Sequence, residues 1–167
     1  MEKVEINKQA RLSQHFTLGE LCKTSAKTQD GNIPSHVHIE NLKRLCGWLE
    51  MLRSEGNKRY GEGDDPIVIN SGYRSEAVNK AVGGVKGSNH LTGCAADIRV
   101  AGIEQLVRYA TILLDISDER QRVGASAGMS KEDFDELLLE RSPRGGYWLH
   151  FAVRPSGNRR KVRLIQT

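Results

Sequence analysis

The longest regular hydrophobic pattern of the chain runs from Ser35 to about Glu55. Its apolar positions recur at steps of three and four residues, at Leu42, Leu45, Cys46, Leu49 and Leu52. This spacing places the five side chains on one face of an α-helix. We expect the helix to begin at Ser35 and to end near Glu55, because Gly56 follows and glycine commonly ends a helix.

Three further helices are indicated by similar signals. An amphipathic helix starts near Ile103, with its apolar face formed by Ile103, Leu106, Val107, Ala110, Leu113 and Leu114. A short helix is expected after Thr17, because Glu20 stands at the capping-box position. Another short helix is expected over residues 75–82, where two glycines follow and close it.

Short apolar runs between these helices predict the strands. The clearest runs are residues 66–70, 95–100, 147–153 and 162–166. Residues 121–127 are a weaker strand prediction, and Ser130 is expected to cap the segment that follows it. The run from Phe134 to Glu140 fits either a helix or a strand, because its leucines satisfy both spacings.

The order of these elements predicts an α+β fold, with a small antiparallel sheet flanked by helices. We expect one domain over residues 1–167, because a chain of 167 residues is long enough for a single core and short for two. No internal repeat or interdomain linker is evident in the sequence. The chain is expected to be a monomer.

The C-terminal end is strongly basic. The formal net charge is +4, and residues 154–163 contain Arg154, Arg159, Arg160, Lys161 and Arg163. Such a segment can attract an anionic polymer such as cell wall, and it equally fits a solvated, turn-rich surface. Because it lacks the interleaved aromatic residues of a nucleic-acid platform, no nucleic-acid partner is expected.

No targeting or membrane segment is evident. No apolar run approaches the ~18 residues of a membrane span, and residues 1–8 lack the hydrophobic core of an export signal. We expect a protein made in the cytoplasm without membrane insertion. If its target lies outside the cytoplasm, other machinery must deliver it.

The three cysteines, Cys22, Cys46 and Cys94, are odd in number and lack C-x-x-C spacing. This pattern argues against a disulfide framework and against a thiolate zinc knuckle. Reduced and mostly buried thiols are expected, including Cys94, which lies between two candidate metal ligands.

Candidate chemistry is concentrated at His90, Asp97 and His150. Two imidazoles and one carboxylate are a set that a catalytic zinc ion takes, with water in the fourth position. These ligands suit Zn²⁺ better than a thiolate-seeking metal, but a histidine taken alone is more often a surface or core residue than a ligand. His36 and His38 are also possible ligands, but two residues apart on a helix they face different directions, so they are expected to be surface residues.

Several motifs together resemble the zinc-dependent D-Ala-D-Ala peptidases, the M15-type family, whose core fold is shared with the hedgehog signalling domain. They are Ser71-Gly72-Tyr73-Arg74, Asn79, Ser88-x-His90-x-x-Gly93-x-Ala95-x-Asp97 and Trp148-x-His150. The likeness extends from about residue 16, where the opening Phe-Thr-Leu-Gly-Glu-Leu resembles phage and bacterial members, to about residue 153.

The resemblance implies a role for each matched residue. His90, Asp97 and His150 would bind zinc. Arg74 would hold a substrate carboxylate or carbonyl, a task that suits the planar guanidinium. The remaining matched residues are expected at the substrate: Ser88 and Asn79 brace the metal loop or the substrate, and Tyr73 and Trp148 form pocket walls or core.

The general base is where the chain departs from the family. Many relatives carry Glu or Asp three residues before the last histidine, but here that residue is Tyr147, a poor base at neutral pH. Glu136 and Glu140 are the nearest replacements, and both face the same side of either a helix or a strand. We expect Glu140 to act as the catalytic base, because it lies closer to the turn that leads back to His150.

The implied function is a zinc metallopeptidase that hydrolyses amide bonds in peptidoglycan stem or cross-link peptides. Small size, basic charge and the missing export signal fit a phage endolysin or tail-associated lysin, acting on the wall after release or as part of a particle. A DD-carboxypeptidase or dipeptidase on free stem peptides is the enzymatic alternative. Because the usual base is absent, a non-catalytic wall-binding module of the same fold is a further alternative.

Overall fold

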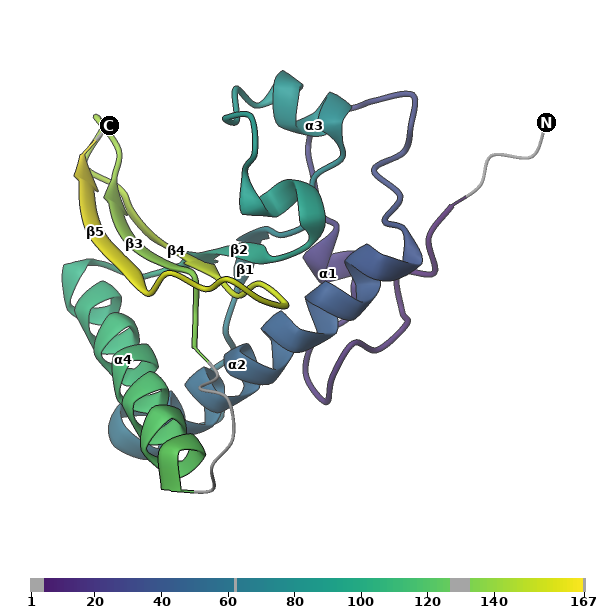
Figure 1. Ribbon diagram of the computed structural model, residues 1–167. Helices are drawn as coiled ribbons and strands as arrows, with labels where there is room; N and C mark the ends of the chain where they lie inside the picture. The colour runs from purple at the N-terminus through teal and green to yellow at the C-terminus, as the bar shows by residue number, and fades with distance from the viewer. Residues whose placement is uncertain (1–4, 62, 127–132, 167) are drawn as a thin grey trace.

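The chain folds into helices packed around one sheet (Figure 1), in a computed structural model that describes residues 5–61, 63–126 and 133–166. The elements in chain order are α1 (Leu18–Leu21), α2 (His36–Tyr60), β1 (Ile69–Ser71), α3 (Glu76–Ala81), the 3₁₀ helix η1 (Asn89–Thr92), β2 (Ala95–Arg99), α4 (Ile103–Ser126), β3 (Glu136–Arg141), β4 (Tyr147–Ala152) and β5 (Lys161–Gln166).

The five strands lie in the order β1-β2-β4-β3-β5. Three of the four pairs are antiparallel, whereas β3 and β5 run parallel. The predicted α+β class with a mainly antiparallel sheet is therefore confirmed, with one parallel pair as a correction. The pair is parallel because β4 ends beside Glu136, the first residue of β3, and the chain crosses there to add β5 on the outer side of β3. The ambiguous run after Phe134 is a strand.

Alternation along the strands divides the sheet into two faces. Leu149 and Phe151 of β4 point into the core, where Phe151 packs against Trp48 of α2 and Phe134 with ring centroids 5.5 and 5.7 Å apart. His150, between them, points to the opposite face. Helices α2 and α4 lie on the core side of the sheet, and α3 and η1 lie on the other side (Figure 1).

Helix α2 continues past its predicted end and stops at Tyr60. Glycine inside a helix costs about 1 kcal/mol, and contacts with α4 offset that cost here. Arg59 donates to Asp115 over 2.6 Å, and the guanidinium of Arg108 lies 4.7 Å from the ring centre of Tyr60. Contacts with α4, which the local sequence pattern does not reveal, therefore allow α2 to continue past Gly56.

The predicted strand over residues 121–127 is wrong, because α4 continues through Ser126. Ser117 and Gln121 stand one helical turn apart, and both donate to the carboxylate of Asp133. The two hydrogen bonds to Asp133 stabilise the helical conformation of this segment. Ser130, the expected cap, lies outside the described residues.

The capping box predicted at Thr17 and Glu20 is confirmed at α1. The side chain of Ser75 caps α3, which was not predicted from the sequence. All three cysteines are free and buried, as expected, and burial raises the pKa of the Cys22 thiol to about 12. None of the helices in the described ranges combines the length and apolar character needed to cross a bilayer.

Candidate metal centre and active site

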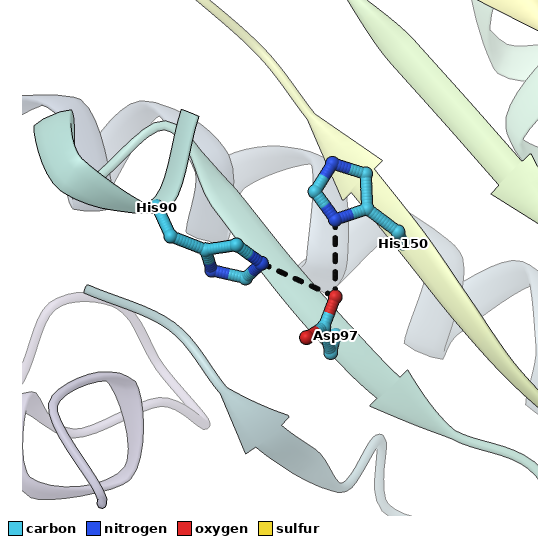
Figure 2. A group of neighbouring side chains, drawn as sticks. All are labelled: His90, Asp97 and His150. Carbon is cyan, nitrogen blue, oxygen red and sulfur yellow. Dashed lines mark hydrogen bonds and ion pairs between the residues drawn. The ribbon is translucent and has the colours of Figure 1, made fainter. Parts of the chain in front are cut away.

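His90, Asp97 and His150 come together on the sheet face away from α4. Each offers one ligand atom, and these atoms all lie within 4.8 Å of one another. Both imidazoles point to the same oxygen of Asp97, with His90 Nε2 at 3.2 Å and His150 Nδ1 at 3.0 Å from Oδ1 (Figure 2). Within the described ranges no second group of this kind occurs, and His36 and His38 are not part of it.

The sheet register explains why Asp97 and His150 meet. Asp97 of β2 is paired directly with His150 of β4, so the two side chains project side by side from the same face. We call this the site face, defined by Asp97, His150 and their same-side neighbours Trp148, Glu136 and Glu140. Because both residues lie on central strands, the backbone holds their separation fixed.

His90 reaches the pair from η1, whose ends are fixed by local chemistry. Ser88 caps the helix, and its Oγ accepts from the backbone N–H of His90 at 3.2 Å. Gly93 ends the helix at φ 74°, in the left-handed region. A Cβ at Gly93 would also lie 2.7 Å from the carbonyl oxygen of His38. Both conditions require glycine at this position.

The outer nitrogen of each imidazole has its own acceptor. His90 Nδ1 lies 2.7 Å from the carbonyl oxygen of Gly72, and His150 Nε2 lies 3.4 Å from Oε1 of Glu136. Since a carbonyl or carboxylate only accepts, these contacts keep the proton on the outer nitrogen. If a cation displaced the hydrogen bonds to Asp97, the lone pairs of His90 Nε2 and His150 Nδ1 would face the ion.

Electrostatics favour an anionic carboxylate at the centre. Burial alone would raise the pKa of Asp97, but hydrogen bonds from His150 and His90 outweigh it and hold the pKa well below its usual range. Burial lowers the pKa of His150, but hydrogen bonds to Asp97 and Glu136 outweigh burial and raise the pKa to about 9. A divalent cation would take the place of the protons that now neutralise Asp97, and the donor set is one that zinc takes.

Arg74 lies beside this centre. Its Nε donates to Ser71 Oγ at 2.9 Å, and one terminal nitrogen donates to Asp97 Oδ2 at 3.0 Å. The other terminal nitrogen has no hydrogen-bond partner among the described residues. Arg74 thus orients Asp97, a task the sequence did not suggest. Its role at the substrate stays a prediction, with one N–H group available for it.

The structure gives the other predicted substrate residues different surroundings. Asn79 is buried, and its side chain and backbone hold the loop between α3 and η1 through Val85 and Gly84. Tyr73 is buried in the core, with its ring 4.9 Å from that of His38. Trp148 lies half-buried on the site face. Of these three side chains, Trp148 is therefore the one placed to touch a substrate beside the metal ligands.

Tyr147 lies on the wrong face of β4 for any catalytic role. It stands three positions before His150 on the strand, so its side chain points to the other face, toward the core, where it is partly buried. Glu136 and Glu140 of β3 do lie on the site face, on either side of Leu138, the partner of His150 in the register. The neighbouring strand β3 therefore supplies two candidates for the carboxylate that β4 lacks.

The two carboxylates differ in their partners. Glu136 contacts His150 and also accepts from Asn89 Nδ2 at 2.7 Å, with Arg159 and Lys161 nearby. Glu140 has no ion pair within the described residues. Burial raises the pKa of Glu140, and this effect outweighs the opposing charge of His150 and a hydrogen bond from Trp148. Glu136 is therefore held by more protein groups than Glu140, which leaves Glu140 the better placed of the two to accept a proton.

The basic segment is occupied by internal ion pairs. Its first four cations each have a carboxylate within 4 Å, in the pairs Arg154–Asp135, Arg159–Asp135, Arg160–Asp118 and Lys161–Glu136. The sequence predicts either a segment that binds an anionic polymer or a solvated surface, and neither prediction includes these ion pairs. Only Arg163 of the segment lacks an acidic partner among the residues described, so most of the positive charge is structural.

The chain is similar to known zinc peptidases, in agreement with the candidate zinc site formed by His90, Asp97 and His150. A family model described as peptidase M15 matches residues 14–117, a range that includes His90 and Asp97 and ends before His150. The zinc D-Ala-D-Ala carboxypeptidase of Streptomyces albus G is 31% identical over 84 residues, which are 50% of this chain and 31% of that protein. The match thus spans about a third of the length of that relative. Because the family model covers more than half of the chain, this protein belongs to the peptidase M15 family.

Proposed function

We propose that this protein is a zinc-dependent peptidase that hydrolyses an amide bond in peptides of the D-Ala-D-Ala type. The observation that carries the proposal is the convergence of His90, Asp97 and His150, whose ligand atoms lie within 4.8 Å of one another. Membership of the M15 family and the name of the Streptomyces relative support zinc and this class of substrate.

Each residue near the centre has a distinct task in this proposal. A zinc ion held by His90, Asp97 and His150 would supply a Lewis acid that polarises the substrate carbonyl and makes water a better nucleophile. Glu140 accepts the proton of the attacking water and passes it to the leaving amine. Arg74 uses its available N–H group to hold a substrate carbonyl or carboxylate. Trp148 forms a wall beside the bond to be cleaved.

The finer proposal concerns the natural substrate. Peptidoglycan stem or cross-link peptides carry bonds of this type, and we propose them as the target, with a phage endolysin or virion-associated lysin as the biological setting. Release of the terminal residue from free stem peptides is the alternative, and the name of the Streptomyces relative favours it. In the first setting, we propose that the protein acts on the cell wall after its release or as part of a phage particle.

Product analysis tests the proposal and separates these alternatives. The zinc-loaded protein is incubated with a short peptide that ends in D-Ala-D-Ala and, in parallel, with purified cell walls, each with and without a chelator. Mass spectrometry identifies the bond broken. Release of D-Ala alone supports a carboxypeptidase, and clearing of walls supports a lysin. If the zinc-loaded protein cleaves neither substrate, the enzyme proposal is wrong, and the result supports a non-catalytic wall-binding module instead.

Zinc is also expected to stabilise the fold. Because a metal that binds only the folded state adds about 2.7 kcal/mol at 100 times its dissociation constant, the melting temperature should rise by roughly 5–10 °C for a domain of this size. Differential scanning fluorimetry of the metal-free protein, titrated with zinc, measures the shift. Magnesium at the same concentration is the control, since it prefers oxygen ligands. An unchanged melting temperature would count against a zinc site.

A further inference from the structure

We propose that Arg159 is a positioning residue of the metal centre, acting through Asp135 and Asn89 to hold Glu136 against His150. This inference rests on the proposed zinc site and extends it to a segment beyond the range of the family match. It assigns a task to the basic C-terminal segment other than binding a polymer. Arg159 would fix the orientation of His150 without touching either His150 or the metal ion.

Asp135 is the anchor of the arrangement. Its side chain is fully buried, and a buried carboxylate requires both a cation and hydrogen bonds. Arg159 supplies most of them, because its Nε, a terminal nitrogen and its backbone N–H lie 2.9, 2.7 and 3.0 Å from the carboxylate oxygens. Such a bidentate contact fixes direction as well as charge. The pKa of Asp135, which burial would raise, is lowered to about 2 by these bonds and that of Asn89.

Asn89 connects this anchor to the metal centre. Its side-chain nitrogen donates both to Asp135 Oδ2 at 2.8 Å and to Glu136 Oε1 at 2.7 Å. Asp135 and Glu136 are neighbours in sequence, and a single amide thus joins the two carboxylates. Because Asn89 directly precedes His90 in η1, the same contacts tie the helix that carries one ligand to the strand beside the other.

Glu136 passes the constraint to His150. Its Oε1 accepts from Asn89 and lies 3.4 Å from His150 Nε2, while Arg159 and Lys161 lie 3.6 and 3.8 Å from its Oε2. A carboxylate placed in this way keeps the proton of a metal-bound histidine on Nε2 and the lone pair of Nδ1 toward the metal. Without it the imidazole can adopt the other tautomer or turn, and both reduce metal affinity.

Arg160 offers a matched control in the same segment. It donates to Ser117 and Asp118 of α4, at 3.1 and 2.6 Å, and has no contact with Asn89, Glu136 or His150. Replacing either arginine removes one charge and one anchor of the segment. The replacement of Arg159 alone loosens the contacts that lead to the metal centre.

The test measures zinc affinity by competition with a chromogenic chelator, together with thermal unfolding of each metal-free variant. Outer contacts of metal ligands typically contribute 10- to 100-fold to affinity. We expect Arg159→Ala to weaken zinc binding about 10-fold and Glu136→Ala by about 10- to 100-fold, with Arg160→Ala unchanged. In the Glu136→Ala background, Arg159→Ala should add little, because both act through the same carboxylate.

The outcomes separate this inference from the proposed function. If wild type binds zinc and Arg159→Ala and Arg160→Ala keep its affinity, the inference is wrong and the zinc site stands. If wild type binds no zinc, the metal site is wrong and the inference falls with it. Should Arg159→Ala fail to fold, Arg159→Lys keeps the cation but loses the bidentate contact. An affinity for Arg159→Lys between those of wild type and Glu136→Ala supports the inference, and wild-type affinity overturns it.

Discussion

Replacing Asp97 by alanine is expected to abolish zinc binding and peptidase activity together. Asp97 is the only carboxylate in the ligand cluster of the described residues, and its Oδ1 lies within 3.2 Å of both imidazoles. Its Oδ2 also accepts from Arg74. The variant therefore loses a ligand and leaves a guanidinium facing the two histidines, so a cation that approaches them meets repulsion. The loss of affinity should exceed the ~10- to 100-fold effect of an outer contact.

Metal analysis after dialysis and isothermal titration with zinc measure this loss, and peptide cleavage is assayed on the same samples. Asp115→Ala is the control, because Asp115 is an exposed carboxylate that pairs with Arg59 on the far side of the sheet. It should keep zinc and activity. An Asp97→Ala protein that retained zinc at the wild-type affinity would show that the ion binds elsewhere and would invalidate the ligand assignment.

The metal ligands could be predicted because the motifs that carry them resemble those of a known family, and local rules add the elements on which they lie. Asp97 and His150 were assigned to strands, and alternation along a strand fixes which face each side chain takes. The capped 3₁₀ helix that carries His90 corresponds to no predicted element and is a finding of the structure. What the sequence alone could not show is that β2 and β4 pair with Asp97 opposite His150, since register depends on tertiary packing.

The supporting residues were missed because long-range pairing creates them. In the sequence Arg159 is one of several cations of the basic C-terminal segment, and no motif marks Asn89 or Asp135. The sequence holds one usable signal: Asp135 and Glu136 are adjacent acids at the start of a predicted element, and both precede an apolar run. Because alternation along a strand sends adjacent side chains to opposite faces, the sequence does not predict that Asn89 and Arg159 each contact both carboxylates. Identifying Asn89, His150 and Arg159 as the partners of these acids required the fold.

Glu140→Gln is expected to lower the turnover number by about 10²- to 10⁴-fold, the usual contribution of a general base, while zinc binding is retained. Glutamine keeps the size and the hydrogen-bonding capacity of the side chain but takes up no proton near neutral pH. Glu140 lies on the site face, has no ion pair among the described residues, and burial raises its pKa. A raised pKa makes a carboxylate a stronger base for the proton of water.

Glu136→Gln is the matched control, because both glutamates belong to β3 and lie on the same face beside His150. Glu136 is held by Asn89, Arg159 and Lys161, so its replacement should change zinc affinity more than turnover of the zinc-saturated enzyme. Steady-state kinetics at saturating zinc, combined with the affinity measurement, separate the two effects. If Glu136→Gln instead lost turnover at full zinc occupancy and Glu140→Gln did not, the base would be Glu136, and the division of labour between the two carboxylates would be reversed.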